Sequence, residues 1–277
     1  MPETEADADL RLLTDAARRA GEIATGFIGQ DLDIRYKDDD AGPVTRADLA
    51  VDTALKEILR PARPDYGWLS EETPDGDTRL GKQRVFIVDP IDGTRSYIEG
   101  SRAWAHVLAV VEDGIVQAAV VFLPMLDALY SARLGGGARL NGDTIAVSPR
   151  GALADAEVLA TRPNLDPHHW PGGVPQVKRH HRPSLAYRQA LVAEGRYDAM
   201  FTFRPSWEWD IAAGALILSE AGATVTDRRG LPLRFNGPHP QVDGLVAANP
   251  GLHGALMARL SASAPGTPGS AAKARNR

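Results

Sequence analysis

The sequence contains no cysteine among its 277 residues. This absence excludes disulfides, thiolate metal sites and cysteine nucleophiles, so any metal must be bound by oxygen or histidine. No segment approaches the unbroken run of about 18 apolar residues that a membrane-spanning helix needs. A basic stripe is also missing, because the net charge of −5 comes from interspersed charges of both signs. We therefore expect a small-molecule partner, and neither a nucleic-acid polymer nor a membrane.

The N-terminal segment MPETEADADL lacks the features of a secretory signal. It is acidic and has no apolar stretch followed by small residues, so we expect a cytoplasmic protein. The composition, with 43% apolar and 24% charged residues, is typical of globular proteins. The length predicts one large domain or two closely packed subdomains.

Two amphipathic helices are expected near the start of the chain. Apolar residues recur at three- and four-residue spacing over residues 8–28 and 51–59. Thr45 and Asp48 have the spacing of a helix N-cap and its N3 residue, so the second helix should begin near Arg46.

The rest of the first half has the pattern of an antiparallel sheet. The dipeptide DG at 113–114 separates two apolar runs, 105–111 and 115–123, which predicts a β-hairpin. The dipeptide NG at 141–142 indicates a further turn. We therefore expect two helices packed on an antiparallel sheet.

The second half alternates strands and helices. We expect strands at 156–161 and 223–227 and helices at 185–195 and 210–222, which is an α/β pattern. The tail is rich in Ser, Ala, Pro and Gly and has no periodicity. The predicted division is an N-terminal α+β subdomain at 1–150, a C-terminal α/β subdomain at 151–260 and a disordered tail at 261–277.

The segment VFIVDPIDGT, residues 85–94, places two carboxylates at the end of a predicted strand. Pro90 cannot continue a hydrogen-bonded ladder, so the chain should turn after Asp89 and bring Asp92 back beside it. Several carboxylates without other ligand types suit a hard cation such as Mg²⁺. Gly93 allows close approach of the backbone, and free N–H groups after it would bind phosphate oxygens. Metal ligands beside an anion site suggest phosphate-ester chemistry.

Other acidic residues stand at the ends of predicted elements. The pair Glu71 and Glu72 follows an apolar run, Asp48 lies in the first turn of the second helix, and Asp210 is expected to open a later helix as its N-cap. Each of these acids, taken alone, is also explained by a solvated surface, a turn or a helix cap. Their order along the chain carries the functional signal.

This order resembles the inositol monophosphatase superfamily of Mg²⁺-dependent, lithium-sensitive phosphomonoesterases. The resemblance lies in PVTRAD at 43–48, the Glu-Glu pair, DPIDGT at 89–94 and WDIAAG at 209–214, and it covers roughly residues 8–260. It implies an α+β / α/β fold, a layered αβαβα sandwich of the inositol monophosphatase and fructose-1,6-bisphosphatase type. Most metal ligands would then come from the N-terminal subdomain, and the C-terminal subdomain would complete the site.

The resemblance also implies roles for individual residues. Glu71, Asp89 and the backbone carbonyl of Ile91 would hold one Mg²⁺, and Asp89, Asp92 and Asp210 a second; a third, weaker ion recruited with substrate stays open. In the family, a metal-activated water attacks phosphorus directly. By analogy, catalytic Glu71 and Thr94 would orient the water, Asp48 would accept a hydrogen bond from Thr94, and the N–H groups of Gly93 and Thr94 would bind phosphate.

The substrate is indicated by a departure from the family pattern. In relatives that act on inositol phosphates, a glutamate contacts the sugar hydroxyls, and here Thr202 or Phe203 takes its place. Arg204 and the phrase LSEE at 69–72 look more like the 3'(2'),5'-bisphosphate nucleotidase branch, which converts 3'-phosphoadenosine 5'-phosphate to AMP and phosphate. Arg204 would meet a second phosphate, the alternative being an ordinary surface arginine.

Other functions stay open at this point. One is an inositol-1-monophosphatase or another sugar or histidinol phosphate phosphatase. A non-catalytic member that binds metal or a partner would need a broken ligand set, and the candidate acids are all present. Family members often dimerise, and the sequence leaves a homodimer open.

Three further groups of residues have two interpretations each. Trp207 and Trp209 would line an adenine pocket or belong to the core. The histidine pairs at 168–169 and 180–181 lie in a proline-rich loop, 161–183, without helical ligand spacing, and fit solvated or substrate-rim positions. The three aspartates at 38–40 are expected to form an acidic turn or, as the resemblance implies, to belong to a loop that can lend a residue to a third metal.

Overall fold

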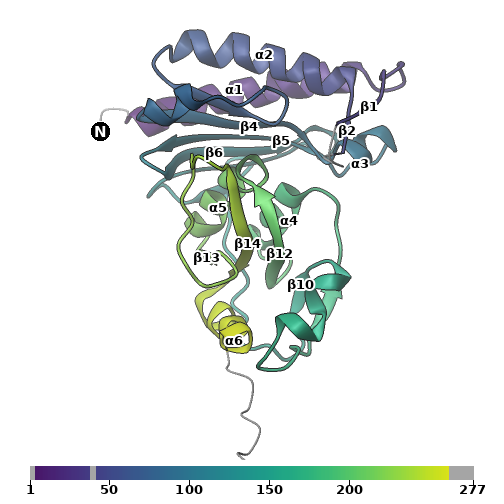
Figure 1. Cartoon of the computed structure of the whole chain (residues 1–277), viewed down its shortest axis with the longest axis vertical. Helices are drawn as coiled ribbons and strands as arrows, with labels where there is room; N and C mark the ends of the chain where they lie inside the picture. The colour runs from purple at the N-terminus through teal and green to yellow at the C-terminus, as the bar shows by residue number, and fades with distance from the viewer. Residues whose placement is uncertain (1–3, 38–41, 262–277) are drawn as a thin grey trace, which may run out of the picture.

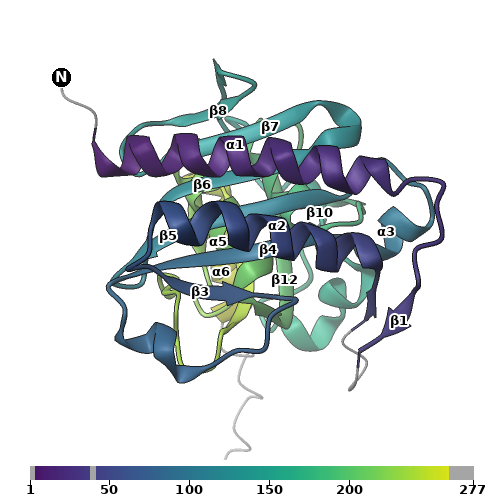
Figure 2. The same ribbon diagram turned by 90° about the horizontal axis from the view of Figure 1, so that it is seen from above.

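Two long helices form one outer layer of the protein. The computed structural model describes residues 4–37 and 42–261. Helices α1 (Glu5–Gly26) and α2 (Arg46–Ala62) lie side by side over one face of a sheet (Figures 1 and 2). Both begin with a capping box, and in α2 the pair is Thr45 and Asp48, as predicted. A short ladder of β1 (Arg35–Tyr36) and β2 (Pro43–Val44) precedes α2.

A seven-stranded sheet forms the second layer, in the order β3-β4-β5-β6-β7-β8-β9. The predicted hairpin is confirmed, with its turn between β5 and β6, and the NG dipeptide joins β8 to β9. The prediction of a wholly antiparallel sheet is wrong at one edge, because β3 pairs in parallel with β4. The strands are β3 (Gly67–Ser70), β4 (Arg84–Asp92), β5 (Ala105–Glu112), β6 (Ile115–Leu123), β7 (Ala128–Arg133), β8 (Ala138–Leu140) and β9 (Asp143–Thr144).

Strand β4 runs through the proline instead of turning before it. It extends to Asp92, and its register against β5 shifts between Asp89 and Asp92. The prediction of a turn at Pro90 is therefore wrong, because the irregular register accommodates the missing N–H within the strand. Gly93 follows with φ of 98°, a value that favours glycine, and the short helix α3 (Thr94–Ile98) begins there.

Helices α4 (Leu185–Ala193) and α5 (Glu208–Glu220) form the middle layer and contact both sheets (Figure 1). The second sheet has the order β11-β10-β12-β14-β13, and α6 (Pro250–Ser261) covers its outer face. The result is an αβαβα sandwich. The strands are β10 (Glu157–Leu159), β11 (Lys178–His180), β12 (Ala199–Trp207), β13 (Thr224–Thr226) and β14 (Gln241–Ala248); the 3₁₀ helices are η2 (Asp77–Gly81), η3 (Pro124–Leu126), η4 (Arg162–Leu165) and η5 (Pro167–His169).

Several boundaries differ from the expectations. The sequence reasoning did not predict β12, β14 or α6. Asp210 does not cap α5, since that helix begins at Glu208 and places Asp210 in its first turn. Ser261 ends α6 instead of starting the tail, and residues 262–277 lie outside the described residues, as do the aspartates at 38–40.

The division into subdomains near residue 150 stays a prediction, although the chain passes from the first sheet to the second between Thr144 and Glu157. Within the described ranges, no helix combines the length and the apolar character needed to cross a bilayer.

Candidate active site

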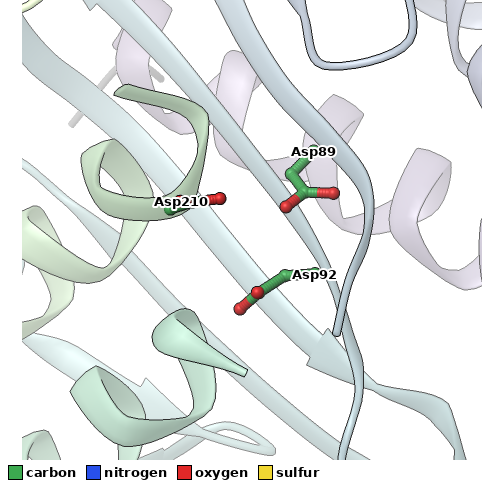
Figure 3. Close-up of side chains that lie close together, drawn as sticks. All are labelled: Asp89, Asp92 and Asp210. Carbon is green, nitrogen blue, oxygen red and sulfur yellow. The ribbon is translucent and has the colours of Figure 1, made fainter. Parts of the chain in front are cut away.

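Three aspartates from two elements meet at the junction of the first sheet and the middle helices. Asp89 and Asp92 come from β4, and Asp210 comes from the first turn of α5 (Figure 3). Each offers a carboxylate oxygen, and these atoms all lie within 4.8 Å of one another. Among the described residues, this is the group of acids with the spacing of a metal site.

Asp89 is fully buried, and its Oδ1 has no hydrogen-bond partner among the described residues. Burial and the negative charges of Glu71, Asp92 and Asp210 raise the pKa of Asp89 well above its usual value. A buried, unpartnered carboxylate oxygen among other carboxylates is a costly arrangement unless a cation satisfies it. The donor set consists of oxygens alone, which fits Mg²⁺.

Asp92 is held by the N-terminal turn of α4. Its Oδ2 accepts hydrogen bonds from Ser184 Oγ at 2.6 Å and from the Ala186 N–H at 2.7 Å, and its Oδ1 accepts from the Leu185 N–H at 3.3 Å. Burial raises the pKa of Asp92 and these hydrogen bonds oppose the rise. An ionised carboxylate has about four lone-pair sites, so Asp92 can accept these bonds and still bind a cation.

Asp210 is positioned through its backbone. Gln189 of α4 is fully buried and donates a hydrogen bond from Nε2 to the Asp210 carbonyl oxygen at 2.8 Å. Burial, followed by the charges of Asp92 and Glu71, raises the pKa of Asp210 well above its usual value. The cluster therefore depends on contacts between α4 and α5 as well as on β4.

Glu71 lies beside the cluster and is paired with a lysine. Lys37 Nζ is 2.8 Å from Glu71 Oε1 and 2.7 Å from Glu72 Oε1. Burial alone would lower the pKa of Lys37, but the charges and hydrogen bonds of both glutamates outweigh burial and raise it. Burial and the Glu71 charge raise the pKa of Glu72 to about 7. Glu71 Oε2 accepts no bond from Lys37 and stays available to a cation.

The hydroxyl of Thr94 links two predicted site residues. Thr94 Oγ1 lies 3.1 Å from Asp48 Oδ1 and 3.1 Å from the Ile91 carbonyl oxygen. Asp48 Oδ2 accepts from the Thr45 N–H at 2.8 Å, which is part of the capping box of α2. Burial raises the pKa of Asp48, and the hydrogen bonds from Thr45 and Thr94 oppose the rise. The hydrogen bond that the resemblance implied is therefore present.

His106 of β5 supports the irregular part of β4 from behind. It is fully buried, and its Nδ1 is 2.5 Å from the Pro90 carbonyl oxygen. Because that oxygen can only accept, Nδ1 carries the proton. Burial lowers the pKa of His106 to about 4, so the ring is neutral at neutral pH.

A cavity of about 420 Å³ opens onto the three aspartates, and we call it the acid cavity. Apart from Asp48, which lies behind Thr94, it brings together the predicted catalytic, metal-binding and phosphate-binding residues. The predicted residues on its wall are Glu71, Asp89, Ile91, Asp92, Gly93, Thr94, Arg204 and Asp210.

Two arginines border the acid cavity on its α4 side. Arg188 is 7% exposed, and its one side-chain hydrogen bond within the described residues runs from Nε to the Ser184 carbonyl oxygen at 3.3 Å. Burial lowers the pKa of Arg188, the positive charge of Arg204 adds to this, and Asp92 and Asp210 oppose it. Arg204 lines the same wall and is exposed. Both guanidinium groups therefore have N–H donors that no other described residue engages and that can bind an anionic ligand.

The two tryptophans differ in exposure, and one of the predicted loop histidines borders the acid cavity. Trp207 and Trp209 stack with ring centroids 4.7 Å apart, and Trp207 remains 40% exposed beside Glu71 and Arg204 in a neighbouring cavity. Trp209 is buried, so the core interpretation holds for Trp209 alone. His181 lines the acid cavity, which is the rim position that the sequence analysis allowed.

Sequence reasoning missed Lys37, Arg188, Ser184, Gln189 and His106. Their signals were weak, since none belongs to a motif that the resemblance used. Arg188 gave the one usable signal. It lies four residues after Ser184 in a helix whose other residues are mostly apolar, and a charged residue in such a helix is unusual.

Comparison with known proteins identifies the family. Residues 6–264 match the sequence profile of the inositol monophosphatase family. An inositol-1-monophosphatase of Rhizobium meliloti (strain 1021) is 36% identical over 236 residues, covering 80% of this chain and 86% of that protein. A histidinol-phosphatase of Chlorobaculum parvum is 32% identical and covers 91% and 96%. The 3'(2'),5'-bisphosphate nucleotidase CysQ of Escherichia coli K12 is 33% identical and covers 79% and 90%.

Solved structures agree with this assignment. The Thermotoga maritima IMPase TM1415 has a TM-score of 0.78 at 26% identity, covering 91% of this chain and 96% of that chain. Members of the matched family are Mg²⁺-dependent phosphatases, and the oxygen ligands found here fit such a metal. The chain therefore belongs to the inositol monophosphatase family.

Proposed function

We propose that this protein is a Mg²⁺-dependent 3'(2'),5'-bisphosphate nucleotidase, which hydrolyses 3'-phosphoadenosine 5'-phosphate to AMP and phosphate. The observation that carries the proposal is the pair of arginines, Arg188 and Arg204, on the wall of the acid cavity. Relatives with three different substrates are about equally similar to this chain, so the choice depends on the chemistry of that wall.

The charge of the wall separates the candidate substrates. The leaving group of a bisphosphate nucleotide carries a second phosphate, which Arg188 and Arg204 would bind through charge-assisted hydrogen bonds. The inositol leaving group is neutral and would gain less from two guanidinium groups. Histidinol carries an ammonium group, which the two arginines would repel. The wall therefore favours the bisphosphate nucleotide.

We assign the metal ligands as follows. Asp89, Asp92 and Asp210 would hold one Mg²⁺, and Glu71, Asp89 and the Ile91 carbonyl would hold another, with a third ion joining on substrate binding. Bound Mg²⁺ would lower the pKa of a water molecule and neutralise charge on the phosphate and on the leaving oxygen. The unpartnered Oδ1 of Asp89 supports this assignment.

The side chains around the acid cavity would orient the reactants. Thr94 has one hydroxyl hydrogen, and donation to Asp48 leaves the Ile91 carbonyl free for a cation and the Thr94 lone pairs free for the attacking water. Glu71 Oε2 would accept the other hydrogen of that water. The N–H groups of Gly93 and Thr94 would donate to phosphate oxygens, which gain charge in the transition state.

The test is phosphate release by the purified protein with Mg²⁺, from 3'-phosphoadenosine 5'-phosphate, inositol 1-phosphate and histidinol phosphate in parallel. We expect kcat/KM for the bisphosphate to exceed the others by about 100-fold, which corresponds to about 3 kcal/mol of transition-state discrimination. A higher value for either other substrate would overturn the proposal.

A variant and its matched control test whether the arginines on the cavity wall cause the preference for the bisphosphate. Arg204→Gln should lower kcat/KM for the bisphosphate about tenfold, the effect of one charge-assisted hydrogen bond, and change that for inositol 1-phosphate much less. Arg139→Gln on β8 is the control, because Arg139 is exposed and bonds the Gly142 carbonyl oxygen. Equal losses for both substrates in Arg204→Gln would show that Arg204 does not contact a second phosphate.

A further inference from the structure

Glu71 differs from the clustered aspartates in how its backbone is held. Asp89 and Asp92 belong to the interior strand β4, whereas Glu71 follows β3, a four-residue strand at the edge of the first sheet. The Glu71 N–H donates to the Val88 carbonyl oxygen at 3.2 Å, and the chain then turns away from the sheet. A residue at the end of a short edge strand is less restrained than one inside a sheet. The position of the Glu71 carboxylate therefore depends on further contacts.

A turn of four residues, 70–73, carries Glu71 and Glu72 at its central positions, and we call it the glutamate turn. The Thr73 N–H donates to the Ser70 carbonyl oxygen at 3.4 Å, which is the hydrogen bond of a β-turn. This bond is long, and the two carboxylates that the turn brings together repel each other. A group that holds both ends of the glutamate turn would therefore stabilise it.

Asp52 of α2 contacts both ends of the glutamate turn. Its Oδ1 accepts a hydrogen bond from Ser70 Oγ at 2.6 Å, and its Oδ2 accepts one from Thr73 Oγ1 at 2.9 Å. Asp52 is 5% exposed, so these bonds are shielded from water, and hydrogen bonds to a carboxylate are stronger than those between neutral groups. One bond would be enough to fasten α2 to the sheet. Two bonds to opposite ends also fix the shape of the turn.

Neighbouring side chains orient this arrangement. Lys56 lies one helical turn after Asp52, with Nζ 3.4 Å from Asp52 Oδ2 and 5.8 Å from the centroid of the Trp68 ring. Trp68 Nε1 donates a hydrogen bond to Thr73 Oγ1 at 3.3 Å. The Thr73 hydroxyl thus accepts from Trp68 and donates to Asp52, which fixes its direction.

The same face of α2 supports the other side chain that we assign to the attacking water. Asp48 and Asp52 are four residues apart and both are buried, so they lie on one face of the helix. Asp48 Oδ1 is 3.1 Å from Thr94 Oγ1, and Asp52 holds the turn that carries Glu71. One helix therefore sets the separation between Thr94 and Glu71.

We propose that Asp52 is a positioning residue for Glu71 and acts on it through the two ends of the glutamate turn. The Mg²⁺ position that includes Glu71 then depends on Asp52, and the position that includes Asp210 does not. This inference rests on the proposed metal ligands and is independent of which phosphate ester the protein cleaves.

Calorimetric titration of the purified protein with Mg²⁺ tests the proposal without using the reaction. Asp52→Asn keeps the shape of the side chain and one acceptor oxygen, so one of the two bonds is lost. We expect Mg²⁺ to bind about tenfold more weakly at the Glu71 position, the effect of one such hydrogen bond. Thr73→Val removes a bond from the other partner and should give a similar loss, even if Asp52→Asn fails to fold. Glu57→Gln is the control, because it removes a carboxylate from the exposed face of α2 and should bind Mg²⁺ as the wild type does.

A double variant separates positioning from general destabilisation. In a Glu71→Gln background the Glu71 position is already impaired, so Asp52→Asn should weaken Mg²⁺ binding no further, whereas a purely structural role would add its own loss. Phosphate release from the substrate that the wild type prefers gives a second measurement. Asp52→Asn should raise the Mg²⁺ concentration for half-maximal rate about tenfold and change KM less than about twofold.

The outcomes separate this proposal from the assignment of the metal ligands. If Glu71→Gln weakens Mg²⁺ binding while Asp52→Asn and Thr73→Val bind as the wild type does, the positioning role is wrong and the assignment stands. The positioning role is also wrong if Asp52→Asn causes the same loss with and without Glu71→Gln. If Glu71→Gln itself binds Mg²⁺ as the wild type does, Glu71 is not a ligand and both proposals fall.

Discussion

At Asp89, a carboxylate is fully buried among other acids, and one of its oxygens has no partner in the described structure. Burial and the neighbouring negative charges raise the pKa of Asp89, so its ionised form is disfavoured in the metal-free fold. Such a group destabilises the metal-free fold at neutral pH, a cost that the proposed metal binding would explain.

Asp89→Asn should therefore separate activity from stability. We expect phosphatase activity to fall by at least about 1000-fold, because both proposed metal positions use this carboxylate. In chelator, the variant should unfold at higher denaturant concentration than the wild type, because a like charge is removed from the cluster. Urea unfolding and phosphate release measure the two effects. Asp143→Asn, at an exposed strand position, is the control and should change neither.

His106 should make the protein sensitive to mild acid. Its folded-state pKa of about 4 lies below the usual 6.5, so the buried neutral ring contributes stability above pH 6.5 that is lost as the pH falls toward 4. This shift corresponds to about 3 kcal/mol in free energy of unfolding.

The variant His106→Gln retains a hydrogen-bond donor for the Pro90 carbonyl and does not titrate. We expect the wild type to lose more stability than this variant between pH 7 and pH 4.5, in urea unfolding with chelator present. The carboxylates titrate in both proteins, so their contribution cancels in the comparison. Parallel pH profiles for the two proteins would contradict the assignment.

At the scale of elements, the start of α4 combines a strained backbone with hydrogen bonds to Asp92 of the proposed metal site. Ser184 has φ of 62°, a left-handed value that is uncommon for residues other than glycine. Its Oγ accepts from the Tyr187 N–H at 3.0 Å as a helix cap and donates to Asp92. The hydroxyl thus fixes one end of α4 and one carboxylate of the proposed metal site, a role that would explain why strain is tolerated there.

Two substitutions of Ser184 should differ in their effect on the free energy of unfolding, and both should weaken Mg²⁺ binding. Ser184→Ala removes the cap and keeps the strain, and should lower the free energy of unfolding by about 1–2 kcal/mol. Ser184→Gly removes the cap but relieves the strain, and should be close to neutral. Both should weaken Mg²⁺ binding, measured by calorimetry, because Asp92 loses a hydrogen bond. Mg²⁺ binding equal to that of the wild type in both variants would show that Ser184 does not position Asp92.

For the molecule as a whole, the proposed metal site lies between the first sheet and the middle helices. Asp89 and Asp92 belong to β4 and Asp210 to α5, so a cation bound to all three holds the layers together. Mg²⁺ at 100 times its Kd should add about 2.7 kcal/mol to the free energy of unfolding.

Thermal unfolding with and without Mg²⁺ measures this link. The midpoint should rise by several degrees in Mg²⁺ and fall back in chelator. In Asp210→Asn most of the rise should be lost, because the second element no longer supplies a charged ligand. Asp227→Asn, whose carboxylate serves its own loop, should behave as the wild type. A full rise in Asp210→Asn would mean that the cation does not bridge the layers.

Local chemistry explains which features could be predicted. The capping pair of Thr45 and Asp48 and the DG turn act within a few residues, so their structures follow from sequence spacing. The predictions of a wholly antiparallel sheet and of a turn at Pro90 were wrong, because the pairing of β3 with β4 and the continuation of β4 through Pro90 are decided by neighbouring strands. Strands β12 and β14 escaped notice because they run through the interior, where apolar content carries no clear period.

Three features followed from the sequence by itself: the position of the acids at the ends of elements, the absence of thiol chemistry, and the membership in a phosphatase family. All three depend only on which residue types occur and in what order. Tertiary structure alone decided which groups surround those acids. Lys37 reaches Glu71 and Glu72, Ser184 reaches Asp92, and Arg188 borders the acid cavity across long stretches of chain. Contacts between distant segments depend on how the layers pack. Packing rather than spacing therefore sets the charge of the wall that, as we propose, selects the substrate.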